Sequence, residues 1–210
     1  MTVTQSLIAF VIAAWLLAIT PGIDTAMVLR TAAVEGPRRA LLAVIGICLG
    51  CLTWGAAASA GLGALLHASE MAYTAVKWAG AAYLTWMGVS LLFRPRQRFD
   101  AAAGDGQVPA GSGMASLRRG LITNLLNPKV GVFYVTFLPQ FVPAGMAVAP
   151  WSFMLAVIQL LIGALWLTVL IAATVPLGRM LARPAFIRRL DRVTGGVFIG
   201  FGVKLALSQR

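Results

Sequence analysis

Long apolar runs, separated by short polar stretches, repeat along the whole chain of 210 residues. A helix needs about 20 predominantly apolar residues to cross a bilayer, and six segments are candidates for such spans. These segments cover residues 5–30, 40–66, 71–93, 117–141, 151–175 and 193–207, the last being the shortest. The pattern predicts an all-α, polytopic membrane protein with six transmembrane helices.

A polar stretch between the third and fourth segments divides the chain into two halves. Residues 94–116 contain Ala-Ala-Ala-Gly-Asp-Gly and Pro-Ala-Gly-Ser-Gly, a composition typical of flexible linkers. The first half then covers residues 1–93 and the second residues 117–210, each with three segments. Because an odd number of spans reverses the direction of the chain, we expect a 3+3 inverted repeat.

Composition and charge agree with a membrane protein. Hydrophobic residues make up 60% of the chain and charged residues 11%, whereas soluble domains carry about 25% charged residues. A net charge of +11 could suggest a nucleic-acid partner. The arginines, however, follow the first, third and fifth segments, so the positive-inside rule explains them and argues against that partner.

The same rule gives an orientation. The three basic loops are expected on the cytoplasmic side, which puts both termini outside the cell. If the first segment does not cross fully, five spans remain and the N-terminus lies inside. Since no Lys or Arg precedes the first apolar run, we expect it to be kept as a membrane helix rather than cleaved as a signal peptide.

Two of the predicted spans contain helix-breaking residues at corresponding positions of the two halves. The first has Pro21-Gly22, and the fourth has Asn127-Pro128. Proline lacks the amide hydrogen that an α-helix requires. A simple kink is one interpretation. Paired interrupted helices are, however, the best indication in sequence of a transporter's substrate site, and we favour that reading.

Each break carries one ionisable residue, Asp24 in the first and Lys129 in the second. Charges within a span are costly, at about 2.5–3.5 kcal/mol on insertion scales, and tend to face the protein interior. A structural ion pair is one explanation. The alternative is a site for a zwitterionic amino acid, in which Asp24 contacts the ammonium group and Lys129 the carboxylate. A carboxyl in a dry site can also carry a coupling proton near neutral pH.

Neutral polar residues near the breaks complete the predicted site. Thr20, Asn124 and Asn127 can supply hydrogen bonds to a substrate. Gln159, in the fifth segment, either lines the same cavity or makes a polar contact between helices, and the two interpretations are equally supported.

The sequence resembles the LysE/RhtB-type amino-acid exporters, a superfamily of lysine exporters and homoserine and threonine efflux proteins. The resemblance rests on Thr-Pro-Gly with Ile-Asp-Thr-Ala-Met-Val-Leu-Arg, on Gly120 to Lys129, on Phe137-Leu-Pro-Gln-Phe141, and on Lys77-Trp-Ala-Gly-Ala-Ala-Tyr-Leu. It implies secondary active, proton-driven export of amino acids or close derivatives across the bacterial inner membrane. Many members have a second proline where this chain has Ile23, which predicts a milder first break. With Asp24 as the acid expected within a span, a neutral substrate such as homoserine, threonine or leucine is favoured.

Two small-residue patterns have competing interpretations. Cys48 and Cys51 share a helix face and could serve a thiol-redox carrier or a metal-cation exporter, but neighbouring Gly46 and Gly50 favour a packing face. Gly196 and Gly200 predict packing within the chain, or alternatively a homodimer face. No cofactor, metal-binding or catalytic motif stands out, so neither an enzyme nor a cofactor is expected.

Overall fold

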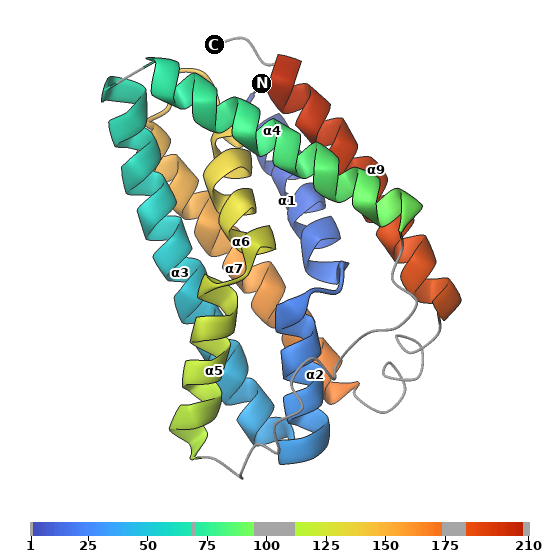
Figure 1. The fold of residues 1–210 in the computed structure, drawn as a ribbon. Coiled ribbons are helices and arrows are strands. Elements are labelled where there is room, and N and C mark those ends of the chain that lie inside the picture. Colours follow the sequence, from blue (N-terminus) through green and yellow to red (C-terminus); the bar gives the residue numbers. More distant parts are fainter. Residues whose placement is uncertain (1, 69, 95–111, 174–183, 208–210) are drawn as a thin grey trace.

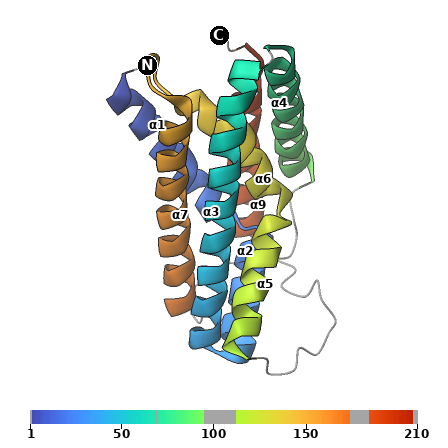
Figure 2. The ribbon, with the colours of Figure 1, turned by 90° about the vertical axis from the view of Figure 1, so that its left-hand side faces the viewer.

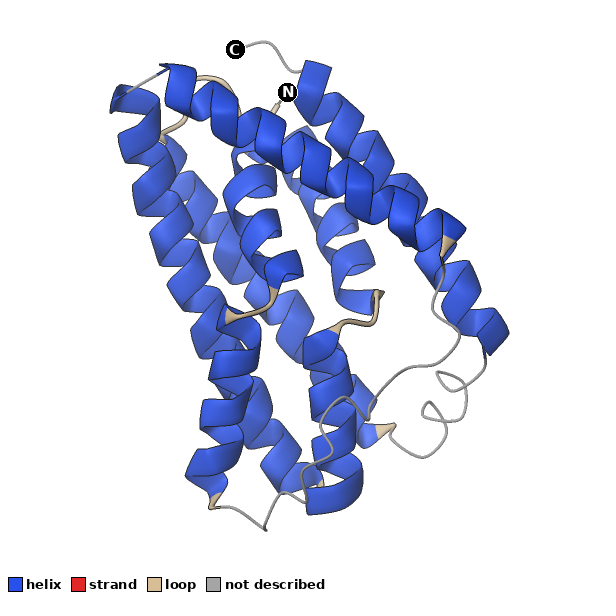
Figure 3. Ribbon diagram, in the orientation of Figure 1, coloured by secondary structure: helices blue, strands red, loops and turns tan. Residues whose placement is uncertain are grey.

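The computed structural model describes residues 2–68, 70–94, 112–173 and 184–207, and all regular structure within these ranges is helical (Figure 3). The elements are α1 (Val3–Ile19), α2 (Ile23–Glu35), α3 (Pro37–Ala68), α4 (Glu70–Phe93), α5 (Gly113–Leu125), α6 (Pro128–Val132), η1 (Phe133–Phe137), η2 (Leu138–Phe141), α7 (Val148–Ala172) and α9 (Pro184–Leu207). The predicted all-α class is confirmed.

Two described helices, within Pro37–Gly61 and Val148–Ala172, are long and apolar enough to cross a membrane. Two bent pairs, α1 with α2 and α5 with α6 to η2, meet the same criterion, which gives up to four spans by length and composition. On α7, the side chains of Leu161, Leu165 and Val169 are spaced four residues apart and exposed, as expected for a face that contacts lipid. The described helices therefore fit a multi-pass membrane protein, while six spans and an inverted repeat stay predictions.

The helices α3 and α7 lie side by side along most of the length of the molecule, and α5 packs against the lower part of α3 (Figures 1 and 2). Helices α4 and α9 pack closely against each other and lean across one side of this group (Figure 1). The two breaks, between α1 and α2 and between α5 and α6, lie at about mid-height of the molecule (Figure 3). The broken helices therefore meet in its interior.

Glycines hold α3 and α5 in close contact. A Cβ atom at Gly46 would lie 2.0 Å from the carbonyl oxygen of Leu117, and one at Gly120 would lie 2.0 Å from that of Ala43. A Cβ atom at Gly50 would lie 2.5 Å from Oδ1 of Asn124. The predicted packing role of Gly46 and Gly50 is confirmed, because only glycine permits these approaches.

The prediction that Gly196 and Gly200 of α9 pack against another helix of the chain was wrong. A Cβ atom at Gly196 or Gly200 would meet no atom of the described residues within 4 Å. Instead, a Cβ atom at Gly202 would lie 2.4 Å from the Thr85 hydroxyl oxygen, and one at Gly88 of α4 would lie 2.6 Å from the Gly195 carbonyl oxygen. The small-residue pattern therefore identified the right helix but not the residues in contact, because a four-residue spacing fixes a shared face and not the direction in which it points.

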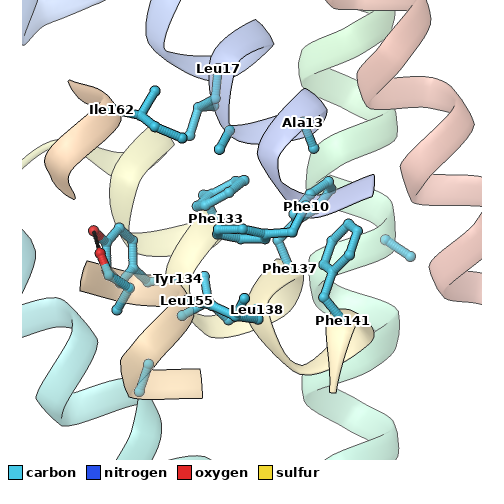
Figure 4. Close-up of a cluster of buried hydrophobic side chains, with 14 residues drawn as sticks. Phe10, Ala13, Leu17, Phe133, Tyr134, Phe137, Leu138, Phe141, Leu155 and Ile162 are labelled. Carbon is cyan, nitrogen blue, oxygen red and sulfur yellow. Dashed lines mark hydrogen bonds between the residues drawn. The ribbon is translucent and has the colours of Figure 1, made fainter. Parts of the chain in front are cut away.

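A cluster of aromatic rings joins α1 to the segment that follows α6 (Figure 4). Phe133, Phe137 and Phe141 recur every four residues, and their rings lie 4.7 and 5.1 Å apart between successive centroids. Phe10 of α1 meets Phe141 edge to face at 5.4 Å. Such pairs contribute about 0.5–1.5 kcal/mol each beyond burial of their area, so the cluster fixes these two segments together on one side of the breaks.

The observed bounds refine the predicted segments. Helix α9 begins at Pro184 and α5 at Gly113, both earlier than the predicted spans, while most of the predicted linker, residues 95–111, lies outside the described residues. The chain bends by 51° at the first break and by 53° at the second, so the two breaks are of similar size. A break milder than that of family members with proline in place of Ile23 stays a prediction. Pro21 and an extended Gly22 end α1, and Ile23 simply starts α2.

Candidate substrate site at the two helix breaks

The first break leaves carbonyl groups of α1 without their helical partners. Pro21 has no amide hydrogen to donate to the carbonyl of Leu17, and the chain is extended at Gly22. The Lys129 ammonium group donates hydrogen bonds to two carbonyl oxygens at the end of α1, at 2.9 Å to Leu17 and 2.8 Å to Thr20. A cation is also favoured at the C-terminal end of a helix by the helix dipole. A side chain from the second break therefore completes the first.

The second break is capped within its own chain segment. The Oδ1 atom of Asn127 accepts a hydrogen bond from the Lys129 amide at 3.1 Å, and Pro128 occupies the first turn of α6, where no amide partner is needed. A π-helical turn, η1, follows directly. Such turns occur frequently at functional sites, and this one places Tyr134 against the same interior space as Asn127.

Asp24 lies in the first turn of α2, where a carboxylate is favoured by the helix dipole. Its Oδ2 atom accepts a hydrogen bond from the side-chain amide of Asn124 at 2.8 Å, and the same amide group lies 3.5 Å from the sulfur of Cys51. Asn127 and Lys129 are also close enough to interact with the carboxyl group. The acidic residue of the first break is thus held by polar groups of the second.

These side chains surround a cavity of about 80 Å³ between the two breaks. Helix α2 contributes Asp24 and Thr25, and α3 contributes Ile47, Cys48 and Cys51. Helix α7 contributes one face, made of Gln159, Leu160, Gly163, Ala164, Trp166 and Leu167. The segment around the second break adds Asn124, Asn127, Lys129, Val130 and Tyr134. The cavity is smaller than the roughly 300–1,000 Å³ of most ligand pockets, so it suits a small solute.

Three buried oxygen atoms at this cavity have no hydrogen-bond partner among the described residues. They are Oδ1 of Asp24, Oδ1 of Asn124 and Oε1 of Gln159. One donor, the indole Nε1 of Trp166, is buried and unpartnered in the same way. Buried polar atoms are rarely left unsatisfied in native proteins. The cavity therefore offers three acceptors, one of them charged, and a donor to whatever occupies it.

All six residues predicted to bind substrate line this one cavity. They are Thr20, Asp24, Asn124, Asn127, Lys129 and Gln159. The structure brings them together, and two of them also make hydrogen bonds to the backbone. The Thr20 hydroxyl donates to Leu16 at 2.6 Å within its own helix, and the Lys129 ammonium group binds backbone carbonyls. For Gln159, the interpretation as a cavity residue agrees with its position.

Several residues of this cavity were not predicted from the sequence, among them Trp166, Tyr134 and Cys51. No local sequence pattern marks Trp166 or Tyr134 as part of a polar site. Cys51 was assigned to a packing face, yet its sulfur faces Asn124. Both cysteines are free thiols, and the described residues contain no group of three or more His, Cys, Asp or Glu side chains arranged to hold a metal ion.

A second, larger cavity lies against the other side of the second break. It measures about 460 Å³ and is lined mainly by apolar residues, among them Trp54, Leu126 and Val135. Asn127 borders both cavities. Only the smaller cavity carries charged residues, so it is the candidate site.

Comparison with known proteins places this chain in a family. The family model described as LysE type translocator matches residues 15–209. The chain is 30% identical to a leucine efflux protein of Enterobacter sp., over 94% of this chain and 93% of the relative. It is 30% identical to a threonine efflux protein of Escherichia coli, over 90% and 92%. An uncharacterised membrane protein of Pseudomonas aeruginosa is 35% identical, over 89% and 88%. No solved structure matches.

Proposed function

Because the chain belongs to the LysE type translocator family and is therefore a membrane transporter rather than an enzyme, we propose that it exports neutral amino acids across the bacterial inner membrane. The observation that carries this proposal is the set of three unpartnered oxygens around one small cavity. An amino acid's ammonium group has three N–H donors. The ammonium group would donate to Asp24, Asn124 and Gln159, and its positive charge would compensate the negative charge of the Asp24 carboxylate.

The rest of the cavity suits the remaining parts of such a substrate. Lys129 supplies positive charge, and the unpartnered Nε1–H of Trp166 can donate to a carboxylate. Ile47 and Leu167 give apolar walls. Among the residues that line the cavity, Asp24 is the one acid. A basic side chain would lack a second partner here, which favours neutral substrates such as homoserine, threonine or leucine.

Asp24 is also the residue proposed to couple export to protons. Its carboxyl group lies at the cavity and has one oxygen without a partner among the described residues, so it can exchange protons when the cavity is open to water. Proton movement into the cell would then drive export of the amino acid. In this proposal the basic loops lie in the cytoplasm, and the two halves of the chain are related as an inverted repeat. A homodimer through the exposed Gly196 and Gly200 face is compatible with this arrangement.

The test is efflux of labelled amino acids from proteoliposomes, with and without a proton uncoupler. We expect neutral amino acids to leave the vesicles, and the uncoupler to slow their net export. Asp24→Asn should abolish gradient-driven export. Exchange of labelled for unlabelled amino acid without a proton gradient separates the two proposed roles of Asp24, substrate binding and proton coupling. If Asp24→Asn still exchanges, it has lost coupling but can still bind the substrate. If all the labelled amino acids tested leave the vesicles at the same rate, the assignment as an exporter of neutral amino acids is refuted.

A further inference from the structure

Gly163 of α7 differs from the other glycines that face the interior. Gly46, Gly50 and Gly120 are sites of close helix contact, where an added Cβ atom would meet another group within 2.5 Å or less. A Cβ atom at Gly163 would meet no atom of the described residues within 4 Å, and yet this glycine lines the cavity. Helix packing therefore does not account for a glycine at this position. The missing side chain leaves space inside the site.

That space lies next to a polar group already assigned to the substrate. Gln159 precedes Gly163 by four residues, so the two share a face of α7, about 6 Å apart along the helix axis. The side chain of Gln159 is 7% exposed, and its Oε1 atom lacks a partner among the described residues. The offset is comparable with the length of an aliphatic amino-acid side chain.

Apolar groups surround the space. Leu160, Ala164 and Leu167 of α7 line the cavity beside Gly163, and Ile47 of α3 lines it from the opposite element. A side chain placed here would meet hydrocarbon, while the ammonium group of the same molecule would meet Asp24, Asn124 and Gln159. Along α7, the polar Gln159 therefore lies about one turn away from Gly163 and its apolar neighbours Ala164 and Leu167.

We infer that the bare position at Gly163 sets the size of the amino-acid side chain that the transporter accepts. The inference rests on the proposed function, because it assigns the apolar end of the same site. Filling the position with a methyl group should exclude large side chains and spare small ones. In a hydrophobic pocket, one methylene group changes discrimination by roughly 10- to 200-fold.

The experiment compares Gly163→Ala with Gly61→Ala in proteoliposome exchange of labelled alanine, threonine and leucine. Gly61 lies in α3, is exposed, and also has nothing within 4 Å of an added Cβ atom, but it does not line the cavity. Both changes replace glycine by alanine within a helix, so both should raise stability by similar amounts. We expect the rate for the largest amino acid that the wild type carries, relative to alanine, to fall about tenfold in Gly163→Ala alone.

The outcomes separate the inference from the proposed function. If the wild-type protein exchanges none of the three amino acids, the proposed function fails. If it exchanges them and Gly163→Ala leaves their relative rates unchanged, or lowers all three equally, the inference is overturned. Failure of Gly163→Ala to fold would also overturn it, because the inference requires that a Cβ atom fit there without a clash.

Discussion

The Arg119 guanidinium group lies 2.6 Å from the Glu35 carboxylate and donates a hydrogen bond to it. Glu35 is the last residue of α2 and Arg119 lies in α5, so the ion pair joins the two halves of the chain. The Ser116 hydroxyl donates to the second carboxylate oxygen at 3.4 Å. Because these side chains are largely shielded from solvent, with 10% of Glu35 and 27% of Arg119 exposed, the contact holds the ends of α2 and α5 together.

Neutralising Glu35 should loosen this contact. We expect Glu35→Gln to lower the free energy of unfolding in detergent by about 1 kcal/mol, since partly exposed ion pairs contribute modestly. The charge-reversed double variant Glu35→Arg with Arg119→Glu should recover part of that loss. Denaturation midpoints of the four proteins form a double-mutant cycle. A coupling energy of zero would show that the pair contributes nothing.

Replacing Lys129 should expose the carbonyls of the first break. In Lys129→Met, the oxygens of Leu17 and Thr20 lose the ammonium group, and we expect the free energy of unfolding to fall by about 2 kcal/mol. Export should be lost as well. Thr20→Val is the matched control, because it removes the hydroxyl group and keeps the carbonyl that Lys129 binds. Equal stability of Lys129→Met and the wild type would refute this structural role.

Two glycines in similar sequence patterns should respond differently to alanine. Gly46→Ala places a methyl group where the Leu117 carbonyl lies, and such overpacking costs roughly 1–3 kcal/mol. Gly200→Ala meets no described atom within 4 Å and should stabilise α9 by up to about 1 kcal/mol through helix propensity. Thermal unfolding of both variants tests the assignment. A destabilised Gly200→Ala would point instead to a covered face, such as that of a homodimer.

Removing both thiols should leave transport intact. Cys48 and Cys51 line the cavity, but the proposed mechanism uses neither sulfur chemically. We expect the double variant Cys48→Ser with Cys51→Ser to keep gradient-driven export within about threefold of the wild type, since buried Cys acts mainly as a small hydrophobic residue. The measurement is amino-acid efflux under reducing and oxidising conditions. Complete loss of export would favour the thiol-redox carrier.

Much of this arrangement could be predicted from the sequence because the bilayer restricts the possible structures. The paired breaks, their ionisable residues and the α3 packing face follow from proline, charge and small-residue spacing. The partner of Lys129 could not be predicted, because the carbonyls it binds belong to backbone far away in sequence. Nor could the positions of Trp166 and Gly163 at the cavity be predicted, since facing a cavity depends on how α7 is rotated against its neighbours.

The interlocking of the two breaks has a consequence for biosynthesis. Thr20 lies 109 residues before the lysine whose side chain satisfies its carbonyl. During translation, α1 is therefore synthesised well before the side chain that donates to the carbonyl of Thr20 at its end. The contact that joins the two breaks can form only after the chain has been made as far as Lys129, so the first break reaches its final hydrogen bonding late in synthesis.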